Sequence, residues 1–219
     1  MFDTRKHRPG DATLIDEFVR RQQHVTLMAA APGEAPQASI LPFVILDDDT
    51  IELHCVQADA TFVAAMANPH VTLLVSDFLA YTPHEWIDAE DASEATLQFE
   101  AVLMRGVATL TTEPREVAAA LARLMDVYGY GPDARPVADD ELYGPQLRRL
   151  AAMRIDVTSR QAKFKVGKGD VQQRRSIAQH LRERGEPNDQ RAAVEIERLA
   201  PLLAPAIDET GSPESPRKS

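Results

Sequence analysis

Cysteine, tryptophan and long apolar runs are scarce in this chain of 219 residues. The single cysteine, Cys55, excludes an internal disulfide and a thiolate metal cage, and we expect it to be a packed thiol in a strand. No apolar run reaches the roughly 18 residues that a membrane-spanning helix needs, and the polar, basic segment 1–10 lacks the apolar core of a secretion signal. These absences predict a cytoplasmic protein with no membrane partner.

Positive charge is also in short supply, since 24 Lys and Arg oppose 34 Asp and Glu and leave a formal net charge of -10. Affinity for duplex DNA depends largely on neutralising phosphates, so nucleic acid is not the default partner. Much of the basic content lies between 148 and 184, which keeps a local basic surface as an alternative. Hydrolase, zinc-protease, phosphate-loop and Rossmann motifs are all missing, so catalysis would need a cofactor.

Hydrophobic spacing predicts one helix followed by an antiparallel meander. Asp11 can cap a helix whose apolar side chains then recur at helical spacing. From residue 24 the period changes to two, with strands expected at 24–30, 37–46 and 51–56. Short turns join these strands, which is typical of antiparallel pairing and not of a parallel α/β sheet.

The second half of the chain mixes long strands with helices. Asp59 is a suitable cap for a short helix at 60–67, and a strand follows at 70–76. We expect a strand at 95–110 that bends or bulges at Gly106, and an amphipathic helix that begins after Pro114. The remaining expected elements are a helix at 141–151, a strand at 155–166 and helices at 171–184 and 189–203.

Several short blocks resemble the FMN-binding negative transcriptional regulators of the PaiB type, which are pyridoxamine-phosphate-oxidase-like split barrels. Their order in the chain is the family's order, and the similarity runs from about residue 13 to 199; the blocks are Ser39-Ile40-Leu41-Pro42-Phe43, Ala80 to Trp86, Arg105-Gly106 and Gln161 to Lys165. The resemblance implies an α+β, mainly β fold, an antiparallel split β-barrel of the FMN-binding type with flanking helices and a C-terminal helical pair. We expect three parts along the chain: the barrel with its covering helices at 1–168, a helical extension at 169–206, and a tail at 207–219 that is disordered because it is rich in Ser, Pro and charge.

The resemblance also implies a homodimer that binds or senses FMN or a related small anionic ligand and represses transcription. DNA contact is implied by the resemblance alone, and it would need the arginines of the last helices, for which a solvated helix face is the competing interpretation; these are Arg174, Arg175, Arg182 and Arg184. Two alternatives stay open: an FMN-dependent oxidoreductase of the same superfamily, and a degenerate barrel that binds without flavin. No catalytic residue and no metal ligand is assigned.

Twelve residues are the predicted cofactor contacts, some from matching blocks and some from polar positions nearby. They are Ser39, Leu41, Pro42, Phe43, His54, Gln57, Thr61, Tyr81, Thr82, Thr96, Lys163 and Lys165. Each also has a structural interpretation, such as core packing for Leu41 and Phe43, turn chemistry for Tyr81 and Thr82, or a solvated strand edge for the lysines. We expect Trp86 at the dimer interface or the barrel mouth.

The chain departs from the family pattern at polar and cationic positions. Ile40 replaces the usual His, and Val56-Gln57-Ala58-Asp59 replaces an Ala-Arg-Ala-Asn type sequence. The family's phosphate lies near the start of the short helix, where Asp59 would occupy the amide donors itself. A carboxylate beside a phosphate costs on the order of 1 kcal/mol or more, so phosphate binding at this helix is predicted to be weakened.

Overall fold

The computed structural model describes residues 12–47 and 49–202, which form two compact units. Unit 1 contains the described residues up to Val19, the segment from Ser76 to Val102 and the chain from Gln161 onward, and unit 2 contains the remainder. The tail predicted to be disordered at 207–219 lies outside the described residues. In the part of the chain that is described, no helix combines the length and apolar character that a membrane crossing requires.

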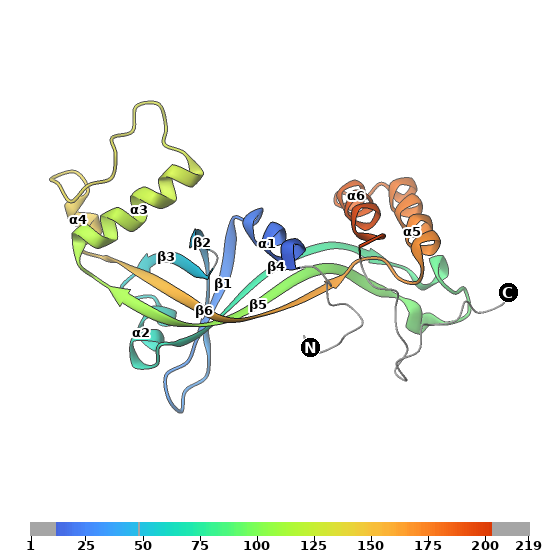
Figure 1. Cartoon of the computed structure of the whole chain (residues 1–219), viewed down its shortest axis with the longest axis horizontal. Helices are drawn as coiled ribbons and strands as arrows, with labels where there is room; N and C mark the ends of the chain where they lie inside the picture. Colours follow the sequence, from blue (N-terminus) through green and yellow to red (C-terminus); the bar gives the residue numbers. More distant parts are fainter. Residues whose placement is uncertain (1–11, 48, 203–219) are drawn as a thin grey trace. The chain divides into compact units, whose positions relative to one another are not determined.

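Six strands close into a barrel in the order β1-β2-β3-β6-β5-β4 (Figure 1). β1 pairs antiparallel with β2 and β4, and β3 pairs antiparallel with β2 and β6. This arrangement confirms the predicted antiparallel, mainly β fold. The strands are β1 (His24–Ala29), β2 (Gln37–Asp47), β3 (Thr50–Val56), β4 (His70–Thr82), β5 (Thr96–Thr111) and β6 (Leu150–Lys165).

The interior of unit 2 follows from alternation along the strands. On β1 the buried residues are Val25, Leu27 and Ala29, and each is separated from the next by one half-buried residue. β5 continues through Gly106, where a Cβ would lie 2.5 Å from the Asp156 carbonyl oxygen. The glycine therefore permits a close approach of β6, and the strand does not break there.

Three helices belong to unit 2, namely α2 (Ala60–Ala67), α3 (Pro114–Tyr128) and α4 (Gly144–Leu147). α3 and α4 pack on the outer side of β6 through Val117, Leu147, Leu150 and Ala152. The helix predicted at 141–151 is wrong, since only four residues are helical there and β6 already begins at Leu150. Pairing of Leu150 with Val56 of β3 overrides the local helix propensity of this Leu-rich and Arg-rich run.

Unit 1 consists of the far ends of β4, β5 and β6 together with α1 (Ala12–Arg20), α5 (Val171–Arg184) and α6 (Asp189–Leu199). Figure 1 shows these helices on one side of the strands. Phe18 of α1 meets Phe164 of β6 edge to face, with the ring centroids 5.4 Å apart. α6 stops at Leu199 and not at the predicted residue 203, because Pro201 cannot continue a helix.

Candidate functional site

The predicted ring contacts on β2 face two different sides of the barrel wall. Leu41 pairs with Val25 and Ser39 pairs with Leu27, and both β1 partners are fully buried. Cross-strand partners share a face, so Ser39 and Leu41 are directed toward the barrel interior. Phe43, which is 4% exposed, belongs to the same set. Among the four predicted residues of this strand, only Pro42 lies on the outer side.

A partly open surface lies on the outer side of β1, β2 and β3, and we call it the outer face. Thr26 pairs with Ile40 across β1 and β2. On β2 and β3, Phe43 lies opposite Leu53, and the same antiparallel register continued along both strands places Pro42 opposite His54 and Ile40 opposite Val56. Ile40 is 72% exposed and Val56 51% exposed, although both are apolar. The outer face consists of Thr26, Met28, Ile40, Pro42, His54 and Val56.

Sequence reasoning placed Pro42 and His54 in the site but left out Ile40 and Val56. Both omitted residues lie two positions along the strand from an included residue, which is the period of a strand face. Burial lowers the pKa of His54 and so favours its neutral imidazole, which can both donate and accept a hydrogen bond. Burial also raises the pKa of the interior Cys55 thiol to about 12, as expected for a packed thiol.

A second group of predicted residues gathers at the start of α2. Asp59 caps the helix by accepting from the Thr61 amide at 2.8 Å and from the Thr61 hydroxyl at 2.5 Å. The Ser39 hydroxyl donates to the same carboxylate at 2.9 Å. Burial alone would raise the pKa of Asp59, but the hydrogen bonds from Thr61 and Ser39 outweigh it and lower that pKa. The carboxylate is therefore ionised at neutral pH.

The side chain of Gln57 forms hydrogen bonds that hold two strands together. Its side-chain amide donates to the carbonyl oxygens of Arg148 at 3.1 Å and Leu150 at 3.0 Å. These bonds attach the end of β3 to the start of β6 within unit 2. The side-chain nitrogen of Gln57 is thus used in hydrogen bonds to the backbone. A contact between Gln57 and the cofactor stays a prediction.

The remaining predicted residues belong to unit 1, and the structure separates them onto two sides of its strands. Thr82 is fully buried, and its hydroxyl accepts a hydrogen bond from Gln98 at 2.9 Å. Gln98 also accepts from the Gly167 amide at 2.6 Å, which joins β4, β5 and the segment after β6. Thr96 precedes Gln98 by two positions on β5, and its hydroxyl oxygen is buried.

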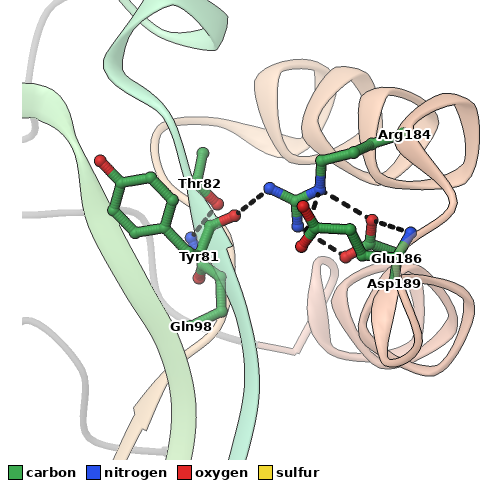
Figure 2. Close-up of polar contacts among 6 residues, drawn as sticks. All are labelled: Tyr81, Thr82, Gln98, Arg184, Glu186 and Asp189. Carbon is green, nitrogen blue, oxygen red and sulfur yellow. Dashed lines mark hydrogen bonds and ion pairs between the residues drawn. The ribbon is translucent and has the colours of Figure 1, made fainter.

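Tyr81, Lys163 and Lys165 lie on the side away from the helices of unit 1. Both lysines are half-buried and alternate with the fully buried Phe164, which contacts α1. Tyr81 is 46% exposed, and Figure 2 shows its ring directed away from Arg184. β4 extends to Thr82, so Tyr81 and Thr82 lie in a strand and not in the predicted turn.

Arg184 has a structural role, as Figure 2 shows. Its guanidinium donates to both oxygens of Asp189 at 2.6 and 2.8 Å and to the Tyr81 carbonyl at 2.8 Å. It also lies 5.1 Å from the centre of the Trp86 ring, which stacks on His180. Trp86 therefore packs against α5 within unit 1, and its place in a dimer stays a prediction.

The arginines considered for DNA contact are mostly engaged inside unit 1. Arg174 is 5% exposed and donates to the Ala200 carbonyl, while Arg182 forms two hydrogen bonds of 2.6 Å with Glu197. Together with the Arg184 contacts, these interactions occupy three of the four side chains. Their geometry favours a helix-pairing role over an open basic surface.

These features define an antiparallel barrel with a partly open apolar outer face, flanked by helices. Residues 1–159 match a family model described as "Putative FMN-binding domain", which covers most of the chain. The chain therefore belongs to this family. Comparison with curated protein sequences gives no match.

Solved structures share the fold at low sequence identity. The FAD and heme binding protein from Mycobacterium smegmatis is 15% identical with a TM-score of 0.57, and the match covers 74% of each chain. The flavocytochrome Anf3 from Azotobacter vinelandii is 19% identical with a TM-score of 0.55, covering 72% of this chain and 68% of the other. A conserved hypothetical protein from Mycobacterium tuberculosis is 17% identical with a TM-score of 0.53, covering 73% and 88%. These similarities and the family match agree with the predicted split barrel.

FMN needs an apolar wall for its ring and a clamp for its dianionic phosphate. The outer face, with Ile40, Pro42 and Val56, fits the first requirement. The start of α2 does not fit the second, because Asp59 takes the Thr61 amide and is itself negative. Within the described residues, no Lys or Arg pairs with Asp59. The ring thus has a suitable surface, whereas the predicted phosphate position has the wrong charge.

Proposed function

We propose that this protein is a flavin-binding homodimer whose ring site is the outer face of unit 2. The observation that carries the proposal is the exposure of Ile40 and Val56, two apolar side chains on neighbouring strands beside the half-buried Pro42 and His54. Contiguous exposed apolar surface marks a binding site more often than isolated exposed residues do. The family match supports a flavin as the ligand.

The residues of the outer face have separate tasks in this proposal. Ile40, Pro42 and Val56 bind the flat ring and exclude water from one of its sides. His54, held neutral by burial, orients the polar edge of the ring through a hydrogen bond. When bound, a flavin supplies hydride and one-electron transfer, for which these side chains provide no substitute.

A second copy of the chain completes the proposed site. A ring lying on a strand surface keeps its other side in water unless something covers it, and two copies that share the outer face would bury both sides. Tyr81, Lys163 and Lys165 of the second copy are the proposed additional contacts, with its lysines supplying positive charge. Sedimentation analysis of the purified protein, with and without flavin, tests the dimer directly.

Flavin titration followed by visible absorbance tests the ring site. Replacing Ile40 with Gln is expected to weaken flavin binding about tenfold, since one lost apolar contact of this size is worth about 1.4 kcal/mol. Val194→Gln is the matched control, because Val194 on α6 is 51% exposed and lies in unit 1. Equal effects of the two substitutions, or no flavin binding by the wild type, would refute the proposal.

A flavin site is compatible with two functions, an oxidoreductase and a transcriptional repressor, and different assays distinguish them. Reduction of the bound flavin by a reduced nicotinamide would assign the oxidoreductase alternative. The repressor implied by the PaiB-type resemblance would instead retain DNA in a salt-sensitive and sequence-selective way. Because Arg174, Arg182 and Arg184 are engaged within unit 1, the described structure gives the repressor role no arginine surface on α5 beyond Arg175.

A further inference from the structure

We infer that the exposed side of α2 pairs with α2 of a second copy of the chain, antiparallel and across a two-fold axis at Val63. The inference rests on the homodimer of the proposed function, and it adds a contact between the copies that needs no ligand. It uses no residue of the proposed ring site, so the two can fail separately.

α2 lacks the polar side that a surface helix normally has. It contacts β1 and β2 through its buried residues, which are Thr61, Phe62, Ala64 and Ala65. The other four residues are exposed and all apolar, and we call them the α2 stripe: Ala60, Val63, Met66 and Ala67. The two larger side chains are 54% and 63% exposed. A helix that is apolar on all sides is normally covered on all sides, so the stripe needs a partner.

The segment around the stripe is also depleted of charge. Between Val56 and Pro69 the chain carries one charged side chain, Asp59, whereas 26% of the whole chain is charged. The Asp59 carboxylate accepts hydrogen bonds from Ser39 and from the fully buried Thr61, so it does not belong to the stripe. The core of a protein interface is likewise poor in charged residues and enriched in Met.

α3 provides the contrast within the same unit. It too packs on the barrel with one side, through Val117 and Ala120 among others. Its other side exposes Arg115, Glu116 and Asp126, as expected for a helix that faces water. The uncharged surface of α2 is therefore a local feature and not a general property of the helices of unit 2.

Charge favours a second copy as the partner. The chain has a formal net charge of -10, so two copies repel one another wherever acidic surfaces meet. Salt screens charges that lie more than about 10 Å away, so the repulsion depends mainly on the residues at the contact itself. The α2 stripe carries no charge and can meet its own copy without this cost. A basic partner would find no complementary charge on the stripe.

Side-chain size also favours pairing of the stripe with itself. In a two-fold contact, if one residue touches a second residue of the other copy, the second touches the first in return. With the axis at Val63, Ala60 of each copy lies opposite Met66 of the other, because both are three residues from Val63. A large side chain thus meets a small one twice, and the two Val63 side chains meet at the axis.

The stripe forms the centre of a larger contact. A standard interface buries about 800 Å² on each partner, which is more than four side chains supply. Ala58 and Pro69 flank the two ends of α2, and both are exposed and uncharged. These flanking residues extend the contact without adding charge.

Sedimentation equilibrium of charged variants at Val63 tests the inference. Val63→Lys and Val63→Glu each place like charges against one another at the axis, so each should raise the Kd of the dimer at least about 100-fold. An equimolar mixture of the two variants should dimerise again, because Lys of one copy then faces Glu of the other. Val194→Lys is the matched control, since Val194 on α6 is 51% exposed and belongs to unit 1. This control should change the Kd of the dimer by less than about threefold.

The mixture also guards against a folding artefact, because misfolded variants would not recover on mixing. Variants that dimerise as well as the Val194→Lys control would overturn the inference, and so would variants that stay monomeric in the mixture. Either result leaves the ring site to the Ile40→Gln titration. Wild-type protein that sediments as a monomer at all concentrations, with and without flavin, would overturn both the inference and the proposed homodimer.

Discussion

The ion pair between Arg184 of α5 and Asp189 of α6 gives a quantitative test of how unit 1 holds its helical pair (Figure 2). The side chain of Asp189 is 2% exposed and that of Arg184 is 19% exposed. Asp189 also accepts from the Glu186 amide at 2.9 Å, so its removal takes a partner from that amide and two hydrogen bonds from the Arg184 guanidinium. Breaking a buried pair by removing one partner costs about 3–5 kcal/mol, and we expect a value near the lower end for Asp189→Ala.

The chain contains its own control for this prediction. Arg182 and Glu197 form an equally short two-bond pair between the same helices, but their side chains are 36% and 42% exposed. An exposed ion pair contributes about 0–1 kcal/mol because water screens it. Glu197→Ala should therefore cost much less than Asp189→Ala, although the two pairs look alike in hydrogen-bond geometry.

Urea unfolding followed by fluorescence measures both variants. Trp86 is the single tryptophan and lies against His180 and Arg184, so its emission reports on unit 1. The free energy of unfolding should fall by about 3 kcal/mol for Asp189→Ala and by less than about 1 kcal/mol for Glu197→Ala. Equal losses would show that burial does not set the strength of these pairs. An Arg184→Met, Asp189→Leu double variant should be less destabilised than Asp189→Ala, because it leaves no unpaired charge.

Three further predictions concern unit 2. Gly106→Ala should destabilise the protein by about 1–3 kcal/mol in thermal or urea unfolding, because its Cβ would meet the backbone of Asp156, whereas Gly131→Ala, which meets nothing within 4 Å, should have little effect. Cys55, whose pKa burial raises to about 12, should react with a thiol reagent only when the protein unfolds; rapid labelling of the native protein would contradict its packing. Burial alone would raise the pKa of Glu52, but its bonds to Arg123 and Arg154 lower it, so its stabilising contribution is complete above the unfolded pKa of about 4.3 and disappears as the pH falls through the native value. Glu52→Gln should accordingly lose less stability than the wild type on acidification, as measured by circular dichroism.

Local chemistry alone predicts several elements to the residue. α2 at 60–67 and α5 at 171–184 have the expected bounds, because Asp59 and Asp170 each accept from a backbone amide of the first helical turn. The alternation of apolar residues likewise predicts β1, β2 and β3 and their antiparallel order. Capping and alternation act over a few residues, so the sequence contains all the information that they require.

Closure of the barrel decides which side each residue faces, and the sequence cannot show this. Leu41 and Pro42 are neighbours in one resembling block, yet the pairing of Leu41 with the buried Val25 turns Leu41 inward and Pro42 outward. Pairing with β3 likewise makes Leu150 a strand residue despite its helix-favouring surroundings. A strand by itself has two equivalent sides. One side becomes the interior of the barrel only when strands that are distant in the sequence pair with one another. The amino-acid order thus determined most of the elements and the family, and the tertiary structure determined the outer face and the hydrogen bonds that keep Asp59 ionised at the start of α2.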